Sequence, residues 1–253
     1  MNWTFSVTPL PYGFVHFAIL LGTVLAVVLS FIWMRRARER TLERVLFWLG
    51  VCMLVAEAWK QWFVMRYVYE APSMWFFPWQ LCSMAMYCSA LVPFLKGRVR
   101  EAVLVFLCTY SPVGAIFAML FPQDMMRPQI LLFMHSFLYH AVMLVEAAAA
   151  LHLLRRSEKP RFLPALALFL CMAAVAEGIN ALSHWVFIRN VHYESNMFYI
   201  TPFYPSTQPV FSAIAEHAGI GVEILAYLVS ISLGAYLLYL LGALWLRRKK
   251  RVP

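Results

Sequence analysis

The sequence is poor in charged residues. Only 13% of its 253 residues are charged, whereas 63% are hydrophobic. This composition excludes an ordinary soluble domain and is typical of a protein whose chain crosses a membrane several times. The formal net charge of +9 does not indicate a nucleic-acid partner, because the basic residues stand in short clusters between apolar runs. We therefore expect an integral membrane protein that does not bind nucleic acid.

Two sequence signals are also absent. Residues 1–11 contain no basic residue ahead of the first apolar run, so we expect that run to remain as a helix and not to be cleaved as a signal peptide. None of the five cysteines forms a CxxC pair, and all five fall inside apolar runs. A disulfide framework and a zinc site are therefore not expected, and we predict neither a metal nor a soluble cofactor.

The apolar runs predict an all-α, polytopic membrane helical bundle of about seven transmembrane helices. Each run is close to the roughly 20 residues that a spanning helix needs. Within one integral membrane domain, 1–253, we place the spans at 13–34, 44–66, 75–95, 101–121, 129–154, 162–188 and 220–246. Gly219 and Gly221 interrupt the last apolar run and predict a short helix ahead of the final span.

The distribution of lysine and arginine predicts the orientation of the bundle. Alternate connections are either rich or poor in basic residues, and the positive-inside rule places the rich set in the cytoplasm. The N-terminus is then outside and the C-terminus cytoplasmic, which requires an odd number of spans. The rich connections hold Arg35, Arg36, Arg38, Arg40 and Arg44, then Lys96, Arg98 and Arg100, then Arg155, Arg156, Lys159 and Arg161, with the tail from Arg247 to Arg251.

The connection 189–209 is one of those that contain few basic residues. It is aromatic and proline-rich, so we expect it to lie in the membrane interface or to fold over the mouth of the bundle as a lid.

Several ionisable residues stand inside the expected spans, where such groups are costly and usually face protein or water. Glu57 and Lys60 are three residues apart on one helix face, so they can pair with each other. Glu177 and Asn180 share a face in the same way, and can join neighbouring helices.

Cys82 is the cysteine whose surroundings allow chemistry. Counted from the outer ends of their spans, Cys82 and His135 lie at a similar depth, and His140 lies about 7 Å deeper. Either imidazole could therefore meet the thiol. A Cys–His pair is the minimum for thiolate catalysis, because the imidazole takes the thiol proton. From spacing alone, the alternative that Cys82 is a small packing residue stays open.

Segments spread along most of the chain resemble a known family. They are 78–83, 114–122, 137–144 and 196–200, together with Asn180 and Glu223. In this order they resemble the YwaF-type integral membrane proteins, whose animal relative is the transmembrane-protein-164 acyltransferase. Tyr139 departs from the family, which often has a small residue before the histidine.

The resemblance implies an activity. The animal relative is similar to an acyltransferase that makes polyunsaturated ether phospholipids with a cysteine and a histidine, which correspond here to Cys82 and His140. We therefore expect thiol-dependent phospholipid acyl transfer or deacylation through an acyl-thioester on Cys82, with His140 as general base and then general acid. The expected partners are membrane phospholipids, and the expected location is a bacterial cytoplasmic membrane.

Other polar residues are expected to complete the pocket: Gln80, His135, Glu177, Asn180, Asn196 and Glu223. Among them Gln80, Asn180 or Asn196 could donate hydrogen bonds to an oxyanion. A carboxylate, Glu146 or preferably Glu177, could orient the imidazole.

Two other functions fit the same residues. A non-enzymatic transporter or small-ligand receptor would use the buried glutamate, lysine and histidine residues as a proton or ion relay. Histidines on several helices could also ligate haem. The lipid head group, the acyl chain, the choice between transferase and hydrolase and the oligomeric state do not follow from the sequence.

Overall fold

The computed structural model describes residues 3–68, 74–155, 160–187 and 195–250, with side chains described as far as 246. Within these ranges the regular structure is helical, apart from one isolated β-bridge between Thr4 and Gln129. The predicted all-α fold class is confirmed.

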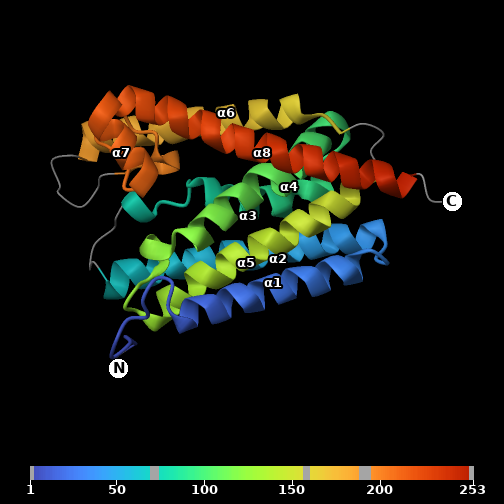
Figure 1. Cartoon of the computed structure of the whole chain (residues 1–253), viewed down its shortest axis with the longest axis horizontal. Coiled ribbons are helices and arrows are strands. Elements are labelled where there is room, and N and C mark those ends of the chain that lie inside the picture. The colour runs from blue at the N-terminus through green and yellow to red at the C-terminus, as the bar shows by residue number, and fades with distance from the viewer. Residues whose placement is uncertain (1–2, 69–73, 156–159, 188–194, 251–253) are drawn as a thin grey trace.

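Eight α-helices follow one another in the described ranges, with short 3₁₀ or π turns between some of them. They are α1 Phe14–Met34, α2 Glu39–Tyr67, α3 Met84–Leu91, α4 Gly97–Leu120, α5 Ile130–Leu154, α6 Phe162–Leu182, α7 Pro209–Ala218 and α8 Ile220–Lys250. Figure 1 shows α1, α2 and α5 along one side of the bundle and α6 and α8 along the other, with the two termini at opposite ends.

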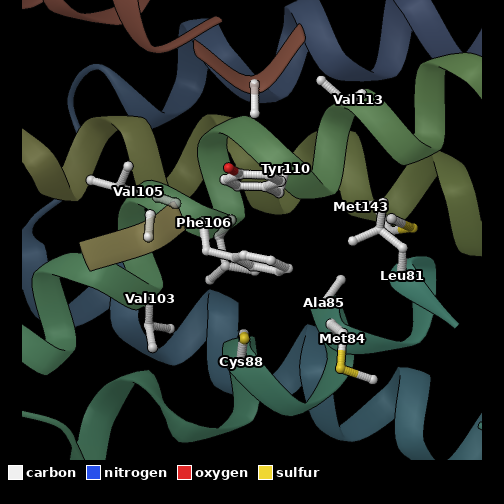
Figure 2. Packing of buried hydrophobic residues seen from close by; sticks show 14 of the residues in the cluster. Leu81, Met84, Ala85, Cys88, Val103, Val105, Phe106, Tyr110, Val113 and Met143 are labelled. Carbon is white, nitrogen blue, oxygen red and sulfur yellow. The ribbon is translucent and has the colours of Figure 1, made fainter. Parts of the chain in front are cut away.

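Helix α4 lies at the centre and contacts α3, α5, α6 and α8. Because it is apolar all round, it can be enclosed on every side. Tyr110 stacks on Phe106 and on Phe169 of α6, with ring centroids 5.5 Å and 4.5 Å apart. Figure 2 shows the Phe106 and Tyr110 rings of α4, with Cys88 of α3 on the Phe106 side. The core therefore fixes α3 and α6 against one central helix.

Five helical segments in the described part of the chain are long and apolar enough to cross a membrane. They are Phe14–Met34, Gly97–Leu120, Ile130–Leu154, Phe162–Val186 and Ile220–Leu246. Helix α2 has 29 residues, enough to span by length, but it is not among these five segments. The count of seven spans thus stays a prediction.

The predicted span 75–95 is not one helix. It consists of the 3₁₀ turn Met74–Phe76, a non-helical stretch, the 3₁₀ turn Leu81–Ser83, the eight-residue helix α3 and a last 3₁₀ turn, Val92–Phe94. Pro78 explains part of the break, because proline lacks a backbone donor and disfavours a helical residue before it. The continuous apolar helix Leu81–Phe94 is too short to span alone.

The short helix α3 packs unusually closely on α2. A Cβ atom on Gly50 of α2 would lie 2.5 Å from the backbone nitrogen of Ala90 and 2.9 Å from the carbonyl oxygen of Met86. Only glycine allows this approach, which is the small-residue contact common between membrane helices.

The last apolar run divides as the glycines predict. Helix α7 ends at Ala218, Gly219 takes the left-handed value φ = +88°, and α8 begins at Ile220. Glycine adopts this conformation without a steric penalty, so the chain can turn between the two helices.

Candidate functional site

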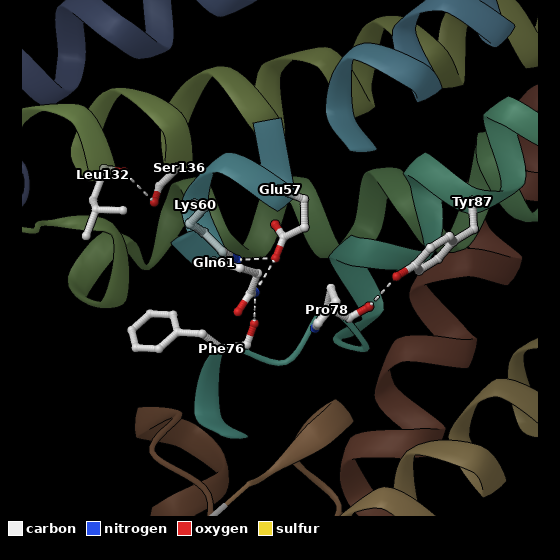
Figure 3. A network of polar contacts seen from close by, with 8 residues as sticks. All are labelled: Glu57, Lys60, Gln61, Phe76, Pro78, Tyr87, Leu132 and Ser136. Carbon is white, nitrogen blue, oxygen red and sulfur yellow. Dashed lines mark hydrogen bonds and ion pairs between the residues drawn. The ribbon is translucent and has the colours of Figure 1, made fainter. Parts of the chain in front are cut away.

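The segment before Cys82, residues 74–80, is fastened to its neighbours through side chains. Gln61 of α2 donates to the carbonyl oxygen of Phe76, and the Tyr87 hydroxyl donates to that of Pro78 at 3.0 Å. Figure 3 shows both contacts. Irregular backbone at membrane depth is stable only when protein groups satisfy its polar atoms. These bonds therefore allow a non-helical chain to place Cys82 inside the bundle.

Cys82 and His140 meet in the interior. The Sγ atom of Cys82 lies 3.3 Å from Nε2 of His140 on α5. Both side chains line one cavity of about 260 Å³. The predicted juxtaposition of this thiol and this imidazole is confirmed, while a catalytic role stays a prediction.

The protonation of His140 follows from its second nitrogen. Nδ1 lies 2.7 Å from the carbonyl oxygen of Ser136, four residues earlier on α5. A carbonyl oxygen can only accept, so Nδ1 carries the proton and donates it to this bond. In the neutral imidazole, Nε2 is then unprotonated and accepts from the Cys82 thiol. The ring is held in the tautomer that a general base for the thiol requires.

The group that orients His140 differs from the expected carboxylate. Glu177 accepts from Nδ2 of Asn180 at 3.3 Å and does not line the cavity. Glu146 is fully buried but does not line it either. The expectation that one of these two glutamates orients the imidazole is wrong, because the carbonyl of Ser136 already occupies Nδ1.

Gly114 of α4 faces the thiol. A Cβ atom on Gly114 would lie 3.5 Å from Sγ of Cys82 and 3.6 Å from the Leu81 side chain. The absence of a side chain there leaves one flank of the sulfur open, and an attacking thiolate needs such space for the ester that it attacks.

The three amide side chains expected as oxyanion donors hold the 195–201 segment instead. Asn180 accepts from the backbone nitrogen of Met197 at 2.7 Å and donates to its carbonyl oxygen at 3.1 Å. Gln80 donates to the carbonyl oxygen of Asn196 at 3.0 Å and accepts from the nitrogen of Phe198 at 2.9 Å. Asn196 accepts from the nitrogen of Thr201 at 3.1 Å. Of the three residues, only Gln80 lines the cavity.

These bonds stabilise a strained backbone. Phe198 and Tyr199 both take left-handed conformations, with φ of +58° and +53°, which residues with a Cβ adopt at a cost of about 1–2 kcal/mol each. Their anchoring places Tyr199 and Gln208 on the cavity wall. The predicted packing of the 189–209 connection near Cys82 is confirmed for 195–209, and 189–194 lie outside the described residues.

Tyr199 is one of the polar residues of this segment that line the cavity. Burial raises the pKa of its phenol, and the Asp124 carboxylate, whose Oδ2 atom lies 3.5 Å from the hydroxyl, acts in the same direction. The hydroxyl therefore stays protonated at neutral pH and acts as a hydrogen-bond donor.

The remaining predicted residues divide between the cavity and its surroundings. His135 lines the cavity beside His140. Glu223 lies on α8, where it accepts from the backbone nitrogen of Ser206 at 3.1 Å, and it does not line the cavity. This hydrogen bond holds the backbone just before α7 against α8.

An ion pair also borders the cavity. Lys60 and Glu57 pair at 2.7 Å on α2, as their spacing predicts. Both line the cavity that contains Cys82, which spacing on one helix could not reveal.

No group of three or more histidine, cysteine, aspartate or glutamate side chains in the described ranges is arranged to hold a metal ion.

The sequence model described as the TMEM164 family matches residues 11–240. The chain belongs to the TMEM164 family. Its apolar helices agree with this membership, and the protein is an integral membrane protein. Neither the curated proteins nor the solved structures that were compared include a match. The segments 78–83 and 137–144, which contain the two members of the Cys82–His140 pair, lie within the matched range.

Proposed function

We propose that this member of the TMEM164 family is a thiol-dependent phospholipid acyltransferase or deacylase. The observation that carries the proposal is the 3.3 Å contact between Cys82 Sγ and His140 Nε2, in the tautomer fixed by Ser136. A cysteine that only fills space in the core does not require a histidine within hydrogen-bonding distance of its sulfur. The resemblance to the YwaF-type proteins and to the transmembrane-protein-164 acyltransferase supports the same pair.

In the first half of the reaction, Nε2 of His140 takes the thiol proton. The Cys82 thiolate attacks the carbonyl carbon of an acyl ester, and the tetrahedral intermediate collapses with cleavage of the ester C–O bond. The imidazolium returns its proton to the leaving lysophospholipid oxygen, and the acyl group stays on sulfur as a thioester. The Nδ1–H bond to Ser136 strengthens while the ring is charged.

In the second half, Nε2 takes a proton from the hydroxyl of a lysophospholipid or from water. The oxygen attacks the thioester, the C–S bond breaks, and the thiolate is reprotonated by the imidazolium. A lysophospholipid acceptor makes the protein a transferase, and water makes it a hydrolase. The cavity walls are apolar enough to favour a lipid and to limit water.

The decisive experiment is the detection of the thioester. Intact-mass and peptide mass spectrometry after incubation with a phospholipid should find one acyl group on Cys82, labile to hydroxylamine. Cys82→Ala should abolish it. Cys108→Ala is the matched control, because the Cys108 thiol donates to Val105 within α4 and does not line the cavity. An unmodified Cys82 in active protein would refute the proposal.

The second candidate is a transporter or small-ligand receptor. The Lys60–Glu57 ion pair and His135, which border the same cavity, favour it. In that case Cys82→Ala should leave function intact, whereas Glu57→Gln should abolish it.

We also propose seven spans, with the N-terminus outside and the C-terminus inside, in a bacterial cytoplasmic membrane.

A further inference from the structure

Two cations of the cavity wall approach the same aromatic ring. Lys60 Nζ lies 6.0 Å from the centroid of the Phe76 ring, and Arg127 Cζ lies 5.7 Å from the same centroid. Lys60 comes from α2, and Arg127 comes from the turn just before α5. All three residues line the cavity with Cys82. Chain segments far apart in the sequence therefore bring two positive charges to the same wall.

A hydrogen bond positions the Arg127 side chain, and among the described residues no ion pair neutralises its charge. Its Nε donates to the backbone carbonyl of Asp124 at 2.9 Å, which fixes the plane of the guanidinium. The Asp124 carboxylate instead lies beside the Tyr199 hydroxyl, at 3.5 Å. Among the described residues, the ion pairs involve Lys60 and Arg100 and not Arg127. A guanidinium has five N–H groups in a planar fork, so most of the Arg127 donors remain for a ligand.

Lys60 has part of its donor capacity left. One ion pair, to Glu57 at 2.7 Å, engages one oxygen of the carboxylate. Gln61 shares that same oxygen at 2.7 Å, which holds Glu57 in place. An ammonium group has three N–H donors, so two remain after the ion pair. Its side chain is 19% exposed, in contrast to 5% for Glu57, so the lysine is the accessible member of the pair.

We propose that Arg127 and Lys60 form a phosphate subsite, which holds the phosphodiester of a lipid while its acyl ester faces Cys82. Arginine suits this role because its fork matches two phosphate oxygens, and lysine adds a point charge. The proposal rests on the proposed function and names a part of the substrate that the cavity recognises. It assigns Arg127 to the binding of the substrate and not to the acyl transfer step.

A purely structural explanation is that both cations only stabilise the Phe76 ring. Cation–π contacts can stabilise the packing of a ring by themselves, and they need no ligand. The two explanations differ in one respect. A phosphate subsite affects only lipids that carry phosphate, whereas a structural contact affects every substrate equally.

The experiment compares two acyl donors with identical chains, a diacyl phospholipid and the corresponding diacylglycerol, on the full-length protein. The readout is the rate of Cys82 thioester formation against donor concentration. Arg127→Gln should reduce the rate with limiting phospholipid about 10- to 100-fold, the loss typical of a charged hydrogen bond. It should do so through a higher half-saturation concentration, and it should leave the diacylglycerol reaction unchanged. Arg127→Lys should give an intermediate loss.

Arg66→Gln is the matched control. Arg66 is an exposed cation in the last turn of α2, stacked on Tyr67 at 5.4 Å, and it does not line the cavity. This variant should leave both reactions unchanged. Equal losses of Arg127→Gln with both donors, or no loss with either, would overturn the phosphate subsite.

A binding measurement keeps this proposal separate from the proposed function. Cys82→Ala protein cannot form a thioester, yet it should bind a lysophospholipid more tightly than the matching monoacylglycerol, and Arg127→Gln in that background should remove the preference. If the wild type forms no thioester but this preference exists, the proposed chemistry fails and the subsite stands. Without the preference, the subsite fails. Competition by inorganic phosphate as strong as by lysophospholipid would identify a free-anion site and overturn the assignment to a lipid.

Discussion

A Cβ atom on Gly114 would stand 3.5 Å from the Cys82 sulfur, at ordinary van der Waals distance. Alanine therefore fits at this position without moving the backbone of α4, but it occupies the open flank of the thiol. A substitution by alanine can therefore change access to the thiol without changing the fold.

We expect Gly114→Ala to fold normally and to react slowly. Alanine stabilises a helix interior by about 0.5–1 kcal/mol relative to glycine, so the thermal midpoint should stay constant or rise. The rate of Cys82 acylation should fall about tenfold or more, because the ester cannot take its aligned position beside the sulfur.

The control for this change is Gly178→Ala on α6, where an added Cβ would meet nothing within 4 Å. It should show the same stability change with full activity. Full activity of Gly114→Ala would mean that the ester approaches the thiol from another side.

A second prediction concerns the anchor of the 195–201 segment. Asn180→Ala removes the hydrogen bonds to both backbone groups of Met197 and leaves these buried groups unpaired. Each unpaired group costs about 1–3 kcal/mol. Thermal unfolding in detergent should show a clear loss of stability, and limited proteolysis should cleave within 189–209 faster. The exposed amide of Gln123 provides the control, since Gln123→Ala should change neither readout.

The third prediction concerns orientation. In a background without the exposed Cys52 and Cys171, a cysteine at Thr207 should react with a membrane-impermeant maleimide in intact cells. A cysteine at Arg98 should react only after permeabilisation. Thr207 is exposed, whereas position 196 is buried and unsuitable for labelling. The opposite pattern would invert the proposed topology.

The sequence predicted most of the helices, because long apolar runs and basic clusters are strong local signals. It could not predict the depth of Cys82. A helical rise of 1.5 Å per residue placed the thiol level with His135. In the structure, the residues before Cys82 are partly extended, and extended chain advances up to about 3.3–3.6 Å per residue. The thiol thus reaches the deeper His140.

The roles of the amides were unpredictable for a different reason. Gln80, Asn180 and Asn196 are all expected in the pocket as possible oxyanion donors, but amide groups bond an oxyanion or a backbone equally well. The choice depends on the fold of the 195–201 segment, whose left-handed residues at 198 and 199 carry no glycine or asparagine as a local signal. By contrast, the Ser136 carbonyl could have been inferred, because a histidine side chain on a helix can reach the carbonyl four residues earlier.

The last prediction tests the choice between the two histidines that line the cavity. His140→Ala removes the only imidazole in contact with the Cys82 thiol among the described residues, and it should slow thioester formation about 10²- to 10⁴-fold, the usual contribution of a general base. His135→Ala should leave the rate within a few-fold of wild type, because His135 lies one turn earlier and packs on Tyr139 at 5.4 Å.

Both histidine variants remove a partly buried ring of the same size from α5, so any general effect of the space left behind should be similar in the two. A separate readout is the alkylation of Cys82 by iodoacetamide, which requires the thiolate and no lipid. Its rate should fall in His140→Ala and not in His135→Ala. If the two variants lose activity equally, the loss reflects packing in α5, and His140 is not the base. If only His135→Ala is inactive, His135 is the base, and the 3.3 Å contact between Cys82 and His140 is structural.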